Sequence, residues 1–170
     1  MNLSYKELLP AHFPANSRVW IYQSSRQFTI AEALQIEEIL ENFSKEWKSH
    51  GDPVENAAFL FFGRFIIVLA NEASVKVGGC STDASVRFIK EIEKAYNVSL
   101  FDRTSLAFVI KDKIELLPLS QLEYAYSNNF IDLNTLYFNN TVLTKQELEE
   151  NWIIPVNKSW LAKRVSTVLS

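Results

Sequence analysis

The chain has 170 residues, 48% of them apolar, with 12 Phe, 6 Tyr and 4 Trp, which excludes a disordered polypeptide and predicts a single domain over residues 1–170. Lys and Arg number 17 against 20 Asp and Glu, so the net charge is −3 and the sequence lacks the basic stripe of a nucleic-acid-binding protein. The single cysteine, Cys80, excludes an intramolecular disulfide and a zinc site built on several thiolates.

No segment has the pattern of a membrane span or of a secretion signal. The longest apolar run, residues 57–70, is broken by Gly63 and Arg64 and is shorter than the ~20 residues that a membrane helix needs. Residues 1–14 mix charged and apolar side chains, whereas a secretion signal has a basic start and an unbroken apolar stretch. We therefore expect a cytoplasmic protein without a membrane span.

The first two predicted elements are a strand and an amphipathic helix. Residues 19–22 form a short bulky run that is typical of a strand. Thr29 and Glu32 then match a T-x-x-E capping box, which predicts the start of a helix. Apolar residues follow at helical spacing, at Ala33, Ile36, Leu40, Phe43 and Trp47. We expect Gly51 to end this helix.

A hairpin is predicted next, because residues 57–62 and 65–70 are apolar runs on either side of Gly63-Arg64. A two-residue Gly-X loop favours a type II′ turn, in which glycine takes the positive φ of the first position. Apolar side chains on both strand faces predict that both strands are central in their sheet. The second sheet face then needs a cover, either from the region 124–160 or from a second subunit.

Shorter elements are predicted in the second half of the chain. Apolar spacing over residues 86–96 indicates a second amphipathic helix, and Lys111-Asp112-Lys113 separates the strands of a second hairpin. Capping boxes are expected at Ser120 with Glu123 and at Thr144 with Glu147, and Ser159 is expected to cap a last helix through Val168. Residues 152–155 are expected to pack over the core.

The order of these elements predicts an α+β fold. Strand, helix, strand, strand, helix and strand match a split β-α-β unit of the ferredoxin-like kind. We expect a mostly antiparallel sheet with a ferredoxin-like β-α-β-β-α-β core, to which a β-hairpin and C-terminal helices are added.

The candidate functional site is the hexapeptide 78–83, which ends where the second amphipathic helix is expected to begin. It holds two of the four glycines and the only cysteine. A helix start offers free N–H groups and a partial positive charge, which favour a bound anion or a thiolate. The interpretation that we prefer is a tight turn with a polar cap around a small buried cysteine.

Cys80 is the candidate catalytic residue, as a nucleophile. The candidate ligand-binding residues are Gly79, Cys80, Ser81, Thr82, Asp83 and Ser85, with Arg87, Arg64 and Arg103 as cationic partners. Asp83 argues against an anion, because a carboxylate in the first turn occupies the favourable electrostatic position. Arg87 lies one residue beyond the position that a phosphatase loop requires, and neither His12 nor His50 is close to Cys80 in the sequence.

Several kinds of site are excluded because the chain lacks the motifs that they require. The chain lacks the G-x-x-x-x-G-K-[ST] pattern of a P-loop and the G-x-G-x-x-G pattern of a dinucleotide site. His12 and His50 have no cluster of acidic residues beside them, so no metal-ligand spacing is present. We expect no metal and no cofactor.

Residues 18–23, 63–66, 79–89 and 100–103 together resemble an uncharacterised bacterial family whose members sometimes carry the label "ABC transporter ATPase". The Gly-Cys-Ser segment is the most specific part of this resemblance. It implies a bacterial, cytoplasmic protein and brings no established activity. The chain has no Walker motif that would support the label, and it is not expected to be a P-loop ATPase.

Two functions follow from these observations as expectations. The first is a non-catalytic cytoplasmic binding or assembly module, with a homodimer as one form of assembly, because the chain is rich in aromatic residues and has no complete catalytic constellation. The alternative is a small enzyme or a sensor of a small anionic ligand that uses the Gly-Gly-Cys-Ser-Thr-Asp segment. Nucleic-acid binding is not expected, since the sequence pI is near 5.5.

Overall fold

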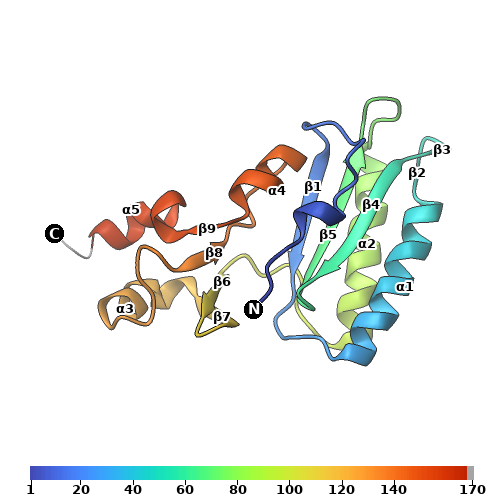
Figure 1. Ribbon diagram of the computed structural model, residues 1–170. Coiled ribbons are helices and arrows are strands. Elements are labelled where there is room, and N and C mark those ends of the chain that lie inside the picture. Colours follow the sequence, from blue (N-terminus) through green and yellow to red (C-terminus); the bar gives the residue numbers. More distant parts are fainter. Residues whose placement is uncertain (168–170) are drawn as a thin grey trace. The chain divides into compact units, whose positions relative to one another are not determined.

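The computed structural model describes residues 1–167, and the chain divides into two compact units. The larger unit consists of Leu3–Phe101 and Leu143–Leu148, and the smaller unit contains Met1–Asn2, Asp102–Val142 and the described residues from Glu149 onward (Figure 1). That residues 1–170 form a single domain stays a prediction.

A three-stranded antiparallel sheet forms the centre of the larger unit. Its strands are β1 (Arg18–Gln23), β4 (Glu55–Phe61) and β5 (Phe65–Asn71), in the order β1-β5-β4. The other elements of this unit are the 3-10 helix η1 (Lys6–Leu8), the helices α1 (Ile30–Glu46) and α2 (Gly79–Tyr96), and the two-residue strands β2 (Lys48–Ser49) and β3 (Asp52–Pro53), which pair with each other.

Helix α1 begins as its sequence predicts and ends earlier. The N–H of Glu32 donates to Thr29 Oγ1 and the N–H of Thr29 donates to Glu32 Oε1, so the predicted capping box is confirmed. The prediction that Gly51 ends the helix is wrong. Trp47 is already extended, with φ −68° and ψ 124°, and Gly51 uses its positive φ of 84° in the turn between β2 and β3.

The core of the larger unit lies between the two helices and one face of the sheet. Ile36 and Leu40 of α1 are fully buried against Ile66 and Val68 of β5, and Ile89 of α2 belongs to the same cluster. Full burial of each such side chain stabilises the fold by about 1.5–3 kcal/mol. The helical spacing of the apolar residues in the sequence therefore identified the buried face of α1.

The hairpin of β4 and β5 differs from its prediction in two respects. Phe61 pairs with Phe65, so the loop has one residue more than predicted, and both Phe62 and Gly63 have positive φ values, of 57° and 60°. The predicted type II′ turn is thus wrong. The strand β5 is central and buried, as expected, but β4 is an edge strand with mostly half-buried side chains.

Part of the cover for the opposite sheet face comes from the N-terminal segment. The ring of Tyr5 lies 5.8 Å from that of Phe61, and its hydroxyl donates to the carbonyl of Leu148. Lys145 donates from Nζ to the carbonyl of Phe13. Leu148 and Lys145 lie in the region 124–160, which was expected to cover the second face of the sheet. The contribution of Tyr5 was not predicted.

The smaller unit contains a second antiparallel sheet with the strand order β7-β6-β8-β9. Its strands are β6 (Ser105–Ile110), β7 (Lys113–Pro118), β8 (Leu136–Phe138) and β9 (Ile153–Pro155). Its helices are η2 (Leu119–Gln121), α3 (Leu122–Ser127), η3 (Val156–Lys158) and α5 (Leu161–Ser166), and α4 (Lys145–Asn151) spans residues of both units. The predicted hairpin of β6 and β7 is confirmed.

The α+β class with antiparallel sheets is confirmed, but the ferredoxin-like order is not. That order requires the strand after the second helix to pair with β1, whereas β6 pairs with β7 and β8 in the other sheet. The edge of β1 instead receives Leu143, whose carbonyl accepts from the N–H of Val19. The residues of β6 favour a strand wherever it lies in the fold. Which strand it pairs with depends instead on the packing of the whole chain.

The predicted caps of the short helices have mixed outcomes. Ser120 lies inside η2 and no side chain caps α3, so that capping box does not form. Thr144 accepts from the N–H of Glu147 as predicted, although the Glu147 carboxylate accepts from Leu143 instead of Thr144. Ser159 Oγ accepts from the N–H of Leu161 at the start of α5, and Val168 lies outside the described residues.

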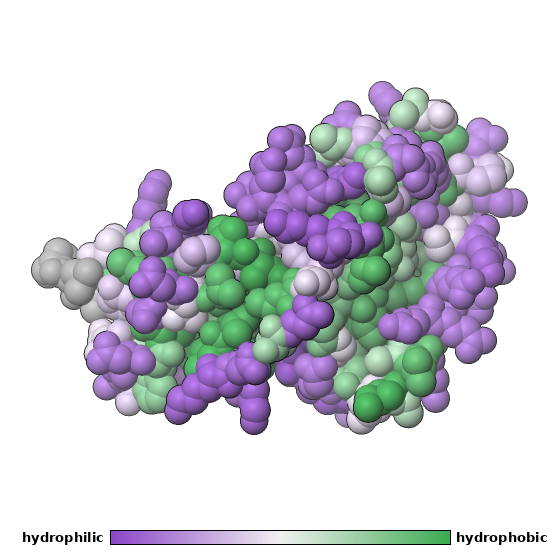
Figure 2. Space-filling model, viewed as in Figure 1, coloured by the Kyte–Doolittle hydropathy of each residue, from purple (hydrophilic) through white to green (hydrophobic). Residues whose placement is uncertain are grey.

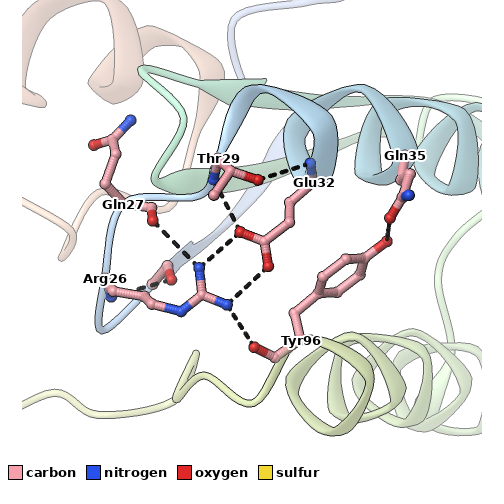
Figure 3. A network of polar contacts seen from close by, with 7 residues as sticks. Arg26, Gln27, Thr29, Glu32, Gln35 and Tyr96 are labelled. Atoms are coloured by element: carbon pink, nitrogen blue, oxygen red, sulfur yellow. Dashed lines mark hydrogen bonds and ion pairs between the residues drawn. The ribbon is translucent and has the colours of Figure 1, made fainter.

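Arg26 joins the start of α1 to the end of α2 (Figure 3). Its guanidinium donates to both carboxylate oxygens of Glu32, each at 2.8 Å, and to the carbonyl of Tyr96 at 2.7 Å. The hydrogen bond from Arg26, followed by that from the Thr29 backbone, lowers the pKa of Glu32 from 4.5 to about 2. These contacts tie together two helix ends that are distant in the sequence.

This pKa predicts a loss of stability in acid. A carboxyl group with a lowered pKa in the folded state stabilises the fold fully above its unfolded pKa, near 4.5, and loses that contribution as the pH falls towards about 2. We expect the urea midpoint of the wild type to fall more steeply across this window than that of Glu32→Gln. Parallel slopes for the two proteins would contradict the prediction.

Candidate functional site

Helix α2 begins inside the predicted hexapeptide. Gly78 is the N-cap, without a side-chain cap, and the helix starts at Gly79. Cys80 and Ser81 therefore lie in the first helical turn, where a loop was expected. Asp83 lies beyond that turn and does not act as the cap.

The hydroxyl groups proposed as anion donors are engaged within the protein. Ser81 donates to the carbonyl of Lys48 at 2.8 Å, and Thr82 donates to the carbonyl of Gly78 at 3.0 Å. Ser85 donates to the carbonyl of Thr82 at 2.7 Å. A hydroxyl has one hydrogen to donate, so none of the three donates to an external anion in this arrangement.

Cys80 is exposed, which corrects the expectation of a buried cysteine. The imidazole of His50 lies beside the same segment: a Cβ added to Gly78 would be 3.1 Å from His50 Nε2. The turn of β2 and β3 brings His50 there, although its distance from Cys80 in the sequence had counted against a pairing of the two. Among the residues that the structure describes, no hydrogen bond joins Cys80 to His50.

Neither Arg64 nor Arg87 contacts the thiol. Arg87 shares an exposed face of α2 with Cys80 and Asp83, at positions i, i+3 and i+7, about 10 Å from Cys80 along the axis. Arg64 is buried at the opposite end of β5 from Gly78, and its Nη1 donates to the carbonyl of Ser24. Arg103 belongs to the smaller unit.

The exposure of Cys80 makes a direct prediction. We expect the thiol of the native protein to react with Ellman's reagent to completion, at a rate within about tenfold of the rate in urea, because no layer of side chains shields it. The absorbance of released thionitrobenzoate measures this, with Cys80→Ser as the blank. A thiol that reacts only after unfolding would restore the buried interpretation.

A pocket of about 450 Å³ in the smaller unit is lined by Thr104, Pro118, Leu119, Ser120 and Arg164. Arg164 is its cation, but the hydroxyl of Thr104 donates to the Asp102 carboxylate at 2.7 Å. The hydrogen bonds from Thr104 lower the pKa of Asp102, which favours its ionised form. Because Thr104 lines the pocket, a negatively charged carboxylate lies close to one wall. The pocket is therefore a poor match for an anion.

The outer edge of β4 is a second candidate site, and the sheet register defines its exposed backbone. Ser24 N–H donates to the carbonyl of Arg64, which places the even-numbered residues of β5 towards β1 and the odd-numbered residues towards β4. In the register of β4 with β5, Phe61 lies opposite Phe65. The N–H and C=O groups of Asn56, Ala58 and Leu60 therefore point away from the sheet, where the carbonyl of Asn56 already accepts from Ser44 Oγ at 3.5 Å.

Within the described part of the chain, no strand pairs with this outer edge. The seven residues of β4 include neither proline nor lysine, and their one charge, Glu55, is held by contacts with His12 Nε2 at 3.0 Å and Asn71 Nδ2 at 2.9 Å. Proline, lysine, bulges and short length are the usual devices that prevent strand pairing at a sheet edge. The edge of β4 has none of these four, and the element that flanks it, α1, contacts its Asn56 end.

One flank of α1 runs beside this edge. Ser44 donates to the side chain of Asn56 at 2.7 Å, and the side chain of Gln27, just before α1, donates to the carbonyl of Phe62 at 2.8 Å. The opposite flank faces α2, where the hydroxyl of Tyr96 donates to Gln35 (Figure 3).

The β4-side flank of α1 carries apolar and acidic side chains at helical spacing. Its exposed residues are Ile30, Leu34, Glu37 and Glu41, and the two apolar side chains are 83% and 63% exposed. Figure 2 shows hydrophobic surface over β4 next to hydrophilic surface on the side of α1. We call the outer edge of β4 together with these four residues the β4–α1 edge.

The described residues contain no group of three or more His, Cys, Asp or Glu side chains that could hold a metal ion, and no helix among them is long and apolar enough to cross a membrane. No protein-family model matches the chain, and no curated protein or solved structure is significantly similar to it. Function must therefore be inferred from the contacts, burial and charges of the chain itself.

Proposed function

We propose that this protein is a non-catalytic binding or assembly module and that the β4–α1 edge is its binding surface. The observation that carries the proposal is the unpaired seven-residue edge strand, whose Ala58 and Leu60 present their backbone groups outward. An added strand would gain hydrogen bonds there, each with a net contribution of about 1 kcal/mol. Strand addition at a sheet edge is a common mode of peptide and protein recognition.

The cytoplasm is the proposed setting. An exposed, unpaired thiol such as that of Cys80 suits a reducing compartment. A bacterial origin rests on the resemblance of the sequence alone.

A small enzyme or anion sensor at the start of α2 is the second candidate. The exposed thiol of Cys80 and the imidazole of His50 beside Gly78 favour it. The engaged hydroxyls of Ser81 and Thr82 count against it. Titration with inorganic phosphate, followed by the amide resonances of residues 79–81, tests this candidate: a saturable shift supports it, and unchanged resonances eliminate it.

Ala58→Pro tests the proposed binding surface. The N–H of Ala58 points away from β5, so proline removes an outward donor and places its ring in the path of an incoming strand, while the β4–β5 ladder stays intact. At high protein concentration we expect the wild type to show concentration-dependent protection of the Ala58 and Leu60 amides from hydrogen exchange. Sedimentation should show weak association that Ala58→Pro reduces.

The control for this test is Ser74→Pro in the exposed turn after β5, away from the outer edge of β4. It should leave association unchanged, and circular dichroism should show that both variants are folded. Equal association of Ala58→Pro and wild type, together with no protection of the Leu60 amide, would count against β4 as the binding surface.

A further inference from the structure

We propose that the partner of the β4–α1 edge is an extended peptide segment that carries apolar and basic side chains, and that it adds to β4 as an antiparallel strand. This inference rests on the proposed function and names the class of partner. It depends on three features of the larger unit: the outward backbone groups of β4, the charge of the neighbouring flank of α1, and the order of side chains along that flank.

The charge of α1 favours a basic partner. Glu37, Glu38 and Glu41 are exposed, and the one lysine of the helix, Lys45, is already paired with Glu41 at 3.1 Å. The remaining acidic side chain near the start of the helix, Glu32, is held by Arg26. A strand seated on β4 would thus lie beside Glu37, for which the described residues show no ion pair, and beside Glu41, whose one cation is the exposed Lys45. This excess of negative charge attracts lysine and arginine side chains.

The same charges make a second copy of the chain a weaker partner than a basic peptide, in line with the weak self-association expected above. In an antiparallel pair of β4 strands related by a twofold axis at Ala58, the two α1 helices would run beside each other in opposite directions. Glu37 and Glu41 of one copy would then approach the acidic middle of the other helix. Like charges that face each other across such an interface reduce affinity.

The order of side chains on α1 sets the order expected in the peptide. Ile30 and Leu34 lie near the Phe62 end of β4, because Gln27, at the start of the helix, donates to the Phe62 carbonyl. The N-terminal end of an antiparallel peptide would lie at that end of β4. Its helix-facing side chains, which alternate along a strand, would therefore be apolar first and basic afterwards.

Synthetic peptides with blocked ends test this order and charge. The first probe is a seven-residue peptide that alternates threonine with valine, lysine and lysine in that order; the second has glutamate in place of both lysines. We expect the lysine peptide to bind saturably, with changes in the amide resonances of Asn56, Ala58 and Leu60, and the glutamate peptide to bind at least about fivefold more weakly.

Glu37→Lys and Glu91→Lys are the matched protein variants, since each replaces one exposed glutamate on the surface of a helix. Glu37→Lys should weaken the lysine peptide about fivefold, whereas Glu91→Lys on α2 should leave its affinity unchanged. Equal binding of the two peptides, or equal effects of the two variants, would overturn the inference.

The outcomes separate this inference from the proposed function. If neither peptide binds and Ala58→Pro still reduces self-association, the edge is a binding surface but its partner is a second copy, and the inference of a basic peptide falls. If neither peptide binds and Ala58→Pro changes nothing, both proposals fall. Binding of the lysine peptide that Ala58→Pro weakens by about tenfold supports both.

Discussion

Replacement of Trp47 by alanine is expected to lower the free energy of unfolding by about 3–5 kcal/mol, the usual cost of removing a large buried side chain. Trp47 is only 4% exposed, and its ring contacts those of Trp20 and Phe43 at centroid distances of 5.9 and 5.3 Å. Its Nε1 also donates to the carbonyl of Ser81 at 3.0 Å. Trp47 thus joins the end of α1 to the first turn of α2.

Urea denaturation followed by far-ultraviolet circular dichroism measures this loss. Trp160→Ala is the control, because that side chain is 40% exposed and its removal should cost less than half as much. Trp47→Phe separates packing from hydrogen bonding: it keeps most of the apolar contact and should cost about 1–2 kcal/mol through the loss of the bond to Ser81. A loss for Trp47→Ala no greater than that for Trp160→Ala would refute the anchoring role.

Gly63→Ala is the second large effect, with an expected loss of about 2 kcal/mol. An alanine at φ +60° costs about 1 kcal/mol in the left-handed region. Its Cβ would also lie 2.3 Å from Gln27 Nε2, so the Gln27 side chain must move and release its hydrogen bond to Phe62, worth about another 1 kcal/mol.

Gly79→Ala is the matched control for Gly63→Ala. Gly79 is the first residue of α2, has no positive φ, and an added Cβ would meet no atom within 4 Å. Alanine is the better helix former by up to about 1 kcal/mol, so this variant should be neutral or slightly more stable. Thermal unfolding of the two variants compares them directly, and an equal loss in both would show that the turn geometry is not responsible.

Local features of the chain were predictable from the sequence. The T-x-x-E box at Thr29 starts α1, and the apolar spacing identifies Ile36 and Leu40 as buried. The two hairpins are recognisable because a strand, a short turn and a second strand are neighbours in the chain. Such features depend on side chains within a few residues of one another, so they can be read directly from the sequence.

Part of the site could be predicted in the same way, and part could not. A helix start near Cys80 was predicted, because glycines precede an amphipathic run, but the helix was expected after residue 83 and begins at Gly79. The exposure of Cys80 was mispredicted, since burial depends on what packs against a residue. His50 was considered as a partner of Cys80 and set aside for its distance in the sequence, but the short hairpin of β2 and β3 brings it beside Gly78.

The sequence by itself thus determined the α+β class, the main helices and the hairpins, because hydrophobic period and capping are local. Only the tertiary structure decided which strands are neighbours: β6 joins a second sheet, Leu143 takes the edge of β1, and the outer edge of β4 is left unpaired in the described chain. The physical reason is that backbone hydrogen bonds between strands are the same for every side chain. Their partners are therefore selected by the packing of the whole chain.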